Sequence, residues 1–252
     1  MKPILFNTEM VQTILDGRKT VTRRLIKPQP GADADLVYAY AASRKQDIGK
    51  WNDRKTGQTW NPPYHADDIL YVRETWGVYC RNWWEADYFN YKADWQAQES
   101  PYGLTEPPKW RPSIHMPKEA ARLFLRVTAV RLERLQEITD EDAIREGIVR
   151  MFDHLSDAEY AEWGNKTAKG MTKADWPWNN YLWHGDFGSC GTGNRKSDAW
   201  PYQSSGYDAP RDSFSSLWNL TVDLKDWDTY GWEANPWVWV IEFERCDKPK
   251  EK

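Results

Sequence analysis

The stretch ILDGRKTVTRR, residues 14 to 24, gathers four basic side chains and two threonines around and just after a glycine. Residues 8 to 15 place apolar side chains at helical spacing, and Gly17 is typical of the first residue beyond a helix. The β-branched residues of 20–26 favour a strand. The stretch therefore predicts a corner at which a short amphipathic helix turns into a strand.

The basic corner belongs to a chain that is acidic overall, with 34 basic and 38 acidic residues and a net charge of -4. This balance argues against broad, charge-driven binding to duplex DNA, so we expect any contact with nucleic acid to be local. The 17 tryptophans are open to two interpretations. They could stack on bases, or they could fill the core and hold irregular loops.

The cysteines and histidines predict neither a disulfide framework nor a metal site. The three cysteines are far apart and form no CxxC pair, and the four histidines lack the spacing of metal ligands. We therefore expect no metal and no other cofactor, and a reducing cytoplasm as the location. No run of about 18 apolar residues indicates a membrane span.

The remaining pattern predicts a mixed α+β fold. Strands are expected around 69–73, over 122–134 and over 236–245, and short helices over 139–146 and 214–222, the first between Thr139 as N-cap and Gly147 as stop. Segments 27–66, 77–112 and 149–212 show no sustained period, and the last of them is a candidate lid or inserted subdomain. Strands without a βαβ rhythm suggest a small β-barrel with short flanking helices and long loop insertions.

Lys19, Thr22 and Arg24 are the first candidates for a functional site. If the turn at Gly17 and Arg18 rotates the lysine round, these three side chains could meet in one pocket. Neighbouring arginines and partial burial would favour the neutral amine of Lys19, which could then act as a base toward the Thr22 hydroxyl. The alternative is that these cations form a solvated patch or contact phosphates.

Four further residues are candidates of weaker signal. Glu146 ends its predicted helix at the negative end of the dipole, where the pKa of a carboxyl rises and suits a proton donor, unless it is an exposed glutamate with no role. Arg73 and Trp76 of VRETW could line the mouth of a pocket, although a structural Arg–Glu pair explains VRE equally well. His115 of SIHMP could bind a ligand or simply pack.

Four blocks of the chain together resemble the ASCH domain, a small β-barrel similar to the PUA fold, and most closely its long phage and prophage versions. They are ILDGRKTVTRR, DDILYVRETW, ITDEDAIREGI and WVWVIEFE. The resemblance implies a single domain over 1–252 whose core comes from about 4–26, 67–76, 113–148 and 213–245, with insertions at 27–66, 77–112 and 149–212. The compact members of the family are less than half as long as this chain.

The resemblance also implies an activity. In the compact bacterial members that hydrolyse N4-acetylcytidine, the catalytic lysine, threonine and glutamate correspond to Lys19, Thr22 and Glu146, and Arg24 matches a family arginine. The implied partner is a modified nucleoside or single-stranded RNA, with no membrane. Other members are ribonucleases or RNA binders, so a non-catalytic module for RNA or modified nucleic acid and a ribonuclease stay open. A phage protein directed at a host protein is a further alternative.

Overall fold

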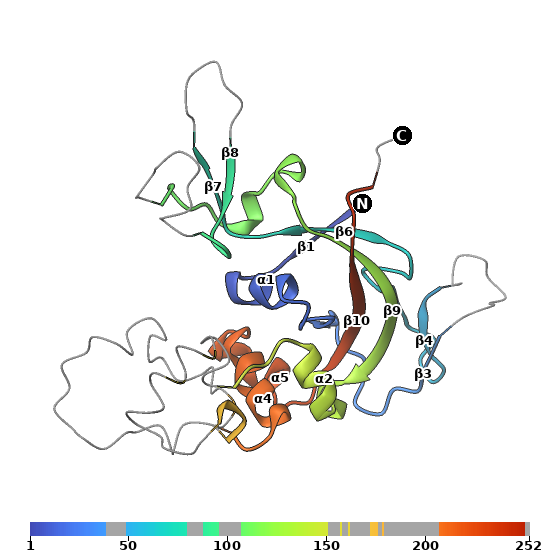
Figure 1. Ribbon diagram of the computed structural model, residues 1–252. Helices are drawn as coiled ribbons and strands as arrows, with labels where there is room; N and C mark the ends of the chain where they lie inside the picture. The colour runs from blue at the N-terminus through green and yellow to red at the C-terminus, as the bar shows by residue number, and fades with distance from the viewer. Residues whose placement is uncertain are drawn as a thin grey trace. The chain divides into compact units, whose positions relative to one another are not determined.

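The computed structural model, whose helices and strands are labelled in Figure 1, divides into two compact units by its internal contacts. Unit 1 comprises Met1–Arg24, Pro30–Leu132 and Trp239–Lys252, and unit 2 comprises Leu25–Gln29 and Glu133–Val238. The residues that the structure describes are 1–38, 49–79, 88–95, 107–150, 157, 161, 172–175, 178 and 207–249. Most of the predicted insertion 149–212 lies outside them. The expectation of a single ASCH-like domain stays a prediction.

The largest sheet has five strands in the order β1-β6-β9-β10-β2. Their bounds are β1 Lys2–Leu5, β6 Ile69–Arg73, β9 Phe124–Arg134, β10 Trp237–Cys246 and β2 Val21–Leu25. β1 runs parallel to β6, and β6 runs antiparallel to β9. The order has two open ends, and the described residues contain no closed barrel. The fold class is therefore mixed α+β, as predicted, while the barrel is not confirmed.

The strand β1 forms one edge of this sheet, and its outer side is covered. The Phe6 amide donates to the Arg73 carbonyl of β6, so by alternation Pro3 and Leu5 turn their backbone groups away from β6. The Pro3 carbonyl accepts from the Tyr64 hydroxyl at 2.7 Å, and the Leu5 carbonyl accepts from the Arg24 guanidinium at 2.7 Å. Because Arg24 belongs to β2, a side chain joins the two edge strands of the sheet.

Two smaller sheets occupy segments where we expected little regular structure. In 27–66 the chain forms an antiparallel sheet of β3 (Leu36–Tyr38), β4 (Trp51–Asp53) and β5 (Thr59–Trp60). In 77–112 it forms the pair β7 (Trp76–Tyr79) and β8 (Tyr88–Tyr91). The expectation was wrong for these strands because runs of two to four residues are too short to show a clear period.

The helices are short, and polar caps begin two of them. The α-helices are α1 Thr8–Leu15, α2 Asp140–Arg145, α4 Pro210–Leu220 and α5 Trp227–Tyr230; the 3-10 turns are Ser113–His115, Lys118–Ala120, Leu135–Glu137, Lys173–Asp175 and Leu224–Asp226. The Asn7 side chain caps α1 by accepting from the Met10 amide, and Thr139 caps α2 by accepting from the Asp142 amide. The predicted bounds of α1 and the predicted cap of α2 are confirmed.

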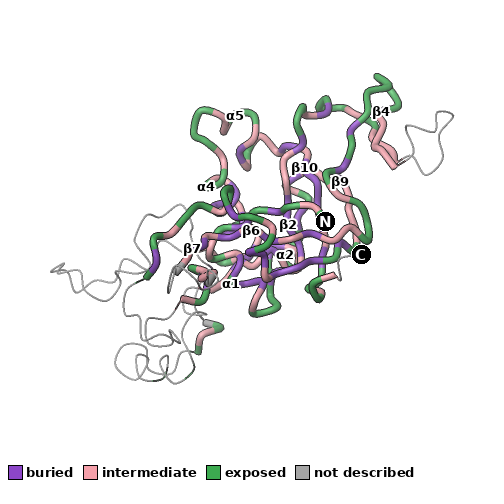
Figure 2. The backbone as a smooth tube through the Cα atoms, turned by 90° about the horizontal axis from the view of Figure 1, so that it is seen from above, coloured by how far each residue is buried: buried purple, intermediate pink, exposed green. Residues whose placement is uncertain are grey.

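The strand β10 is buried more fully than its predicted alternation implied. Val238, Trp239, Val240 and Ile241 are all buried, so both faces of the strand are covered there (Figure 2). A strand covered on both faces lies inside a core and not at a wetted surface. The segment WVWVIEFE thus supplies an interior strand of the sheet, between β9 and β2.

Candidate functional site

The corner after α1 places Lys19 by backbone bonds. Gly17 has a φ of 76°, a left-handed conformation that glycine adopts at low cost. The amides of Arg18 and Lys19 both donate to the Thr13 carbonyl, each at 2.9 Å. The helix therefore ends in a tight turn, as predicted, and Lys19 is fixed directly beyond it.

The side chains of Lys19 and Arg24 meet at one aromatic ring. The Lys19 ammonium nitrogen lies 5.8 Å from the centre of the Phe6 ring, and the Arg24 guanidinium carbon lies 5.2 Å from it. Distances of this kind are typical of cation–π contacts. The turn at Gly17 thus brings together two of the three side chains predicted to meet at this corner.

Lys19, Thr22 and Arg23 are buried, with exposed fractions of 2%, 3% and 5%. Taking a lysine or arginine out of water costs free energy unless other groups compensate the charge or the amine becomes neutral. A solvated patch does not describe these three side chains, although it describes Arg18, which is exposed and pairs with Asp16 at 2.8 Å. The basic corner thus has a buried part, which includes Lys19 and Arg23, and a solvent-exposed part, which includes Arg18.

Glu146 lies in unit 2 and occupies the C-cap of α2, as predicted. Gly147, with a φ of 94°, then ends the helix. The Glu146 side chain is only 3% exposed, which excludes the interpretation of an exposed glutamate at the surface. Burying a carboxyl at the negative end of a helix costs free energy, which interactions with other groups must offset.

Arg73 and His115, two of the predicted pocket residues, belong to one local arrangement in unit 1. The Arg73 guanidinium donates to the backbone carbonyl of Met116 at 2.9 Å and also to that of Ile114. It thereby holds the turn Ser113–His115, on which His115 is exposed. Both groups are accessible enough to contact a ligand, which stays a prediction, but the structure already gives Arg73 a role in holding this turn.

Trp76 lies in a small hydrophobic core and is only 4% exposed. Its neighbours there include Met116 and Phe89, and the Arg111 guanidinium lies 5.1 Å from its ring centre. A base could stack on Trp76 only if this core opened. The predicted binding role of Trp76 therefore has no exposed ring face to support it in this conformation.

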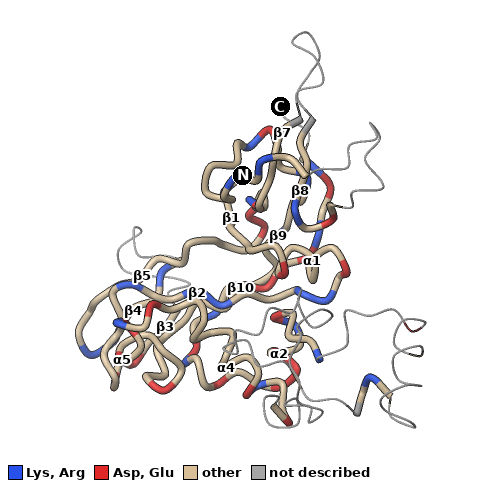
Figure 3. Tube along the Cα trace, turned by 90° about the vertical axis from the view of Figure 1, so that its left-hand side faces the viewer, with Lys and Arg blue, Asp and Glu red and all other residues tan. Residues whose placement is uncertain are grey.

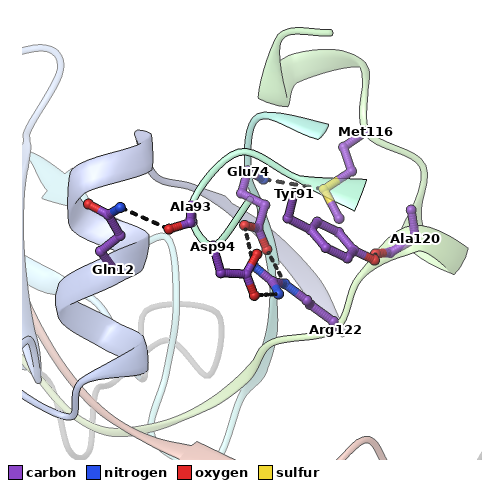
Figure 4. Close-up of polar contacts among 8 residues, drawn as sticks. All are labelled: Gln12, Glu74, Tyr91, Ala93, Asp94, Met116, Ala120 and Arg122. Carbon is purple, nitrogen blue, oxygen red and sulfur yellow. Dashed lines mark hydrogen bonds and ion pairs between the residues drawn. The ribbon is translucent and has the colours of Figure 1, made fainter. Parts of the chain in front are cut away.

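A charged network centred on Arg122 was not predicted from the sequence (Figure 4). The Arg122 guanidinium donates to both Glu74 carboxylate oxygens at 3.0 Å and to Asp94 at 2.5 Å. It also lies 3.9 Å from the centre of the Tyr91 ring. Because Glu74 and Arg122 are 48 positions apart, no local pattern reveals the pair.

Burial and pairing act in opposite directions on the groups of this network. Burial raises the pKa of the Glu74 carboxyl, and the bonds from Arg122 only partly offset that increase. Burial opposes the charge on Arg122 too, but its bonds to Glu74 and Asp94 prevail and raise the pKa of the guanidinium. Burial also raises the pKa of Tyr91 to about 12, so the Tyr91 hydroxyl keeps its proton and donates to the Ala120 carbonyl.

Searches for a metal site, for a membrane span and for related proteins gave the following results. In the parts of the chain that the structure describes, no group of three or more His, Cys, Asp or Glu side chains could hold a metal ion. No helix in those parts is long and apolar enough to cross a bilayer. Comparison with known families, with curated proteins and with solved structures finds no match to this chain.

Proposed function

We propose that this protein is a metal-independent amidohydrolase that removes the acyl group from N4-acylated cytidine. The observation that carries the proposal is the burial of Lys19, Thr22 and Glu146, each at most 3% exposed. The ASCH resemblance marks these three residues as the catalytic set, and polar groups are rarely kept from water without a structural or chemical reason.

The proposed fold is the small ASCH-like β-barrel. The bond from Arg24 to the Leu5 carbonyl supports it, since it joins the first and last strands of the five-stranded sheet. A barrel closed in part by side chains would give the Gly17 corner an inner face on which substrate could lie. Arg24, already at the Phe6 ring beside Lys19, would contact the substrate or the developing oxyanion.

The proposed reaction is acyl transfer to water through an ester on Thr22. Lys19 takes the hydroxyl proton, and the Thr22 oxygen bonds to the acyl carbon. The Glu146 carboxyl gives a proton to the departing cytosine nitrogen as the carbon–nitrogen bond breaks. Water then attacks the ester while the Glu146 carboxylate takes one of its protons. Lys19 returns its proton to the Thr22 oxygen, so the cycle consumes one amide and one water. We expect this reaction in the cytoplasm, as the cysteine usage predicts.

The test is release of cytidine from N4-acetylcytidine by the purified protein in the presence of EDTA. Thr22→Ala and Glu146→Gln should each lower kcat by about 100-fold or more, since each removes a proton-transfer or nucleophilic group. Thr13→Ala is the matched control for a buried threonine, and Glu141→Gln is the control for an exposed glutamate of the same helix. Both controls should keep the activity of the wild type.

A wild-type protein that leaves a panel of acyl cytidines intact would refute the hydrolase. Measured affinity for the same nucleosides without turnover would then favour the non-catalytic binding module. Cleavage of single-stranded RNA would instead identify a ribonuclease. Both of these results, obtained without hydrolysis of acyl cytidines, would exclude the proposed hydrolase.

A further inference from the structure

We propose that a surface of unit 1 built on β7, β8 and residues 107–112 binds single-stranded nucleic acid. This hairpin surface consists of Lys92, Trp95, Lys109, Trp110 and Arg111. It is separate from the residues of the proposed hydrolase, and the proposal does not depend on that activity.

The hairpin surface is built on the two-stranded pair of β7 and β8, with residue 111 bridged to the other side of β7. Trp76 pairs with Tyr91 on one side and forms a bridge with Arg111 on the other, with backbone bonds of 3.2 and 2.7 Å to Arg111. The Lys92 amide donates to the Thr75 carbonyl at 3.0 Å. Two segments about twenty residues apart in sequence therefore flank the same strand.

Lys92 and Trp110 each adjoin a residue that pairs with Trp76, so both lie beside β7. Arg111 pairs with Trp76 itself, and its guanidinium lies 5.1 Å from the centre of the Trp76 ring. Pro108 lies so close to Gly77 that a Cβ there would come within 2.7 Å of the proline ring. The segment that carries Lys109 and Trp110 is thus packed tightly against β7.

The cations of the hairpin surface differ in pairing from most other exposed cations of unit 1. Several basic side chains elsewhere in unit 1 have carboxylate partners, as in the pairs Lys2–Asp68, Arg18–Asp16, Arg54–Asp35, Lys55–Asp33 and Arg126–Glu244. Lys92, Lys109 and Arg111 are exposed, and none has an ion pair with any residue that the structure describes. Cations without a carboxylate partner are available to an anionic ligand. Figure 3 colours the basic and acidic positions along the backbone.

The carboxylate of Asp94 does not cancel this positive charge. Asp94 follows Lys92 by two residues, but its carboxylate is bound by the Arg122 guanidinium at 2.5 Å. Arg122 in turn joins Asp94 to Glu74, and Gln12 of α1 donates to the Ala93 carbonyl at 2.8 Å (Figure 4). The network therefore both compensates the charge of Asp94 and anchors the segment that carries Lys92 and Trp95.

Aromatic rings beside the open cations indicate which anion fits. Trp95 and Trp110 are half-buried and meet edge to face, with ring centres 6.0 Å apart. Bases stack on such rings while lysines and arginines contact phosphates, and unpaired bases are needed for stacking. Three open cations in a chain of net charge -4 are too few for duplex binding of ordinary strength. The chemistry therefore favours a single strand.

The experiment measures the affinity of the wild-type protein for fluorescein-labelled 12-mers of mixed sequence, one of RNA and one of DNA, by fluorescence anisotropy. Three phosphate contacts should make the affinity fall roughly 20-fold between about 50 and 200 mM salt. Lys92→Glu/Lys109→Glu should weaken binding by about tenfold or more. Trp110→Ala should weaken it about fivefold or more.

The matched control is Lys225→Glu/Lys248→Glu, which changes two exposed lysines elsewhere and the net charge by the same amount. It should bind almost as the wild type does, and thermal unfolding should show that all variants fold. Tighter binding of either 12-mer supports the proposal and identifies RNA or DNA as the ligand. Equal weakening by the control, or no effect of Trp110→Ala, would overturn it, as would a wild type that binds neither 12-mer. Thr22→Ala should bind normally, which keeps this result distinct from the fate of the hydrolase.

Discussion

The Glu74 side chain is 1% exposed and relies on Arg122, whose own side chain is 25% exposed, for both of its charge-assisted bonds. A buried pair of this kind contributes little compared with a well-packed apolar pair, but loss of one partner leaves the other charge uncompensated. The same guanidinium covers the Tyr91 ring and binds Asp94, whose side chain is half exposed. Glu74 and Asp94 should therefore contribute very differently to stability.

We predict that Arg122→Met lowers the free energy of unfolding by about 3 kcal/mol, because Glu74 would be buried without its partner. Asp94→Asn should cost less than about 1 kcal/mol, because water screens that pair. Urea unfolding of both variants measures the difference. Similar losses for the two variants would contradict the assignment of Glu74 as the dependent partner.

The elements predicted from the sequence are those whose pattern is local. α1 and α2 each combine a polar cap and a glycine stop with side chains at helical spacing, and β2 and β6 have the residue types and alternation of strands. The elements that escaped prediction are short strands stabilised by distant contacts. β7, for example, depends on Arg111 and Pro108, more than thirty residues away.

The same limit applies to the candidate site. Sequence could propose Lys19 and Arg24 together, whereas Phe6, the ring they share, emerged only from the fold.

At the level of the element, Gly77→Ala should disturb the ribbon of β7, β8 and residues 107–112. The added Cβ would lie 2.7 and 2.8 Å from two carbons of the Pro108 ring, which cannot rotate away. We expect a loss of about 1 to 3 kcal/mol in the free energy of unfolding, together with weaker binding to the 12-mers. Gly31→Ala, where the nearest atom is 3.7 Å from the new Cβ, is the control and should be nearly neutral in both measurements.

At the scale of the molecule, several tryptophans of the described residues pack against guanidinium groups. Arg111 lies over Trp76 in unit 1, and Arg134 lies over Trp237 in unit 2, at 5.1 and 4.4 Å from the ring centres. Trp232 likewise has a guanidinium, that of Arg211, at 5.4 Å. Much of the unusual tryptophan content is therefore structural in the described residues, which leaves few rings, Trp110 among them, for stacking on a ligand.

The raised pKa of Glu74 predicts how the stability of the molecule depends on pH. Because the folded state holds this proton more tightly than the unfolded state does, its contribution is fully present below the ordinary pKa of a glutamate. It is lost as the pH rises through the raised value. We predict that Glu74→Gln flattens the dependence of the unfolding free energy on pH in this weakly acidic range. Urea unfolding of wild type and variant at several pH values measures it, and parallel curves would contradict the prediction.

The covered side of β1 has a consequence for how this protein behaves at high concentration. An edge strand with bare carbonyls and amides is a template on which another polypeptide can extend the sheet, which is a common first step toward fibrils. Here a proline lacks the amide hydrogen, and a tyrosine hydroxyl and a guanidinium already occupy the outward carbonyls of Pro3 and Leu5, so we expect the sheet to resist extension at this edge. Arg24, whatever it contributes to chemistry, would then also guard this edge against self-assembly.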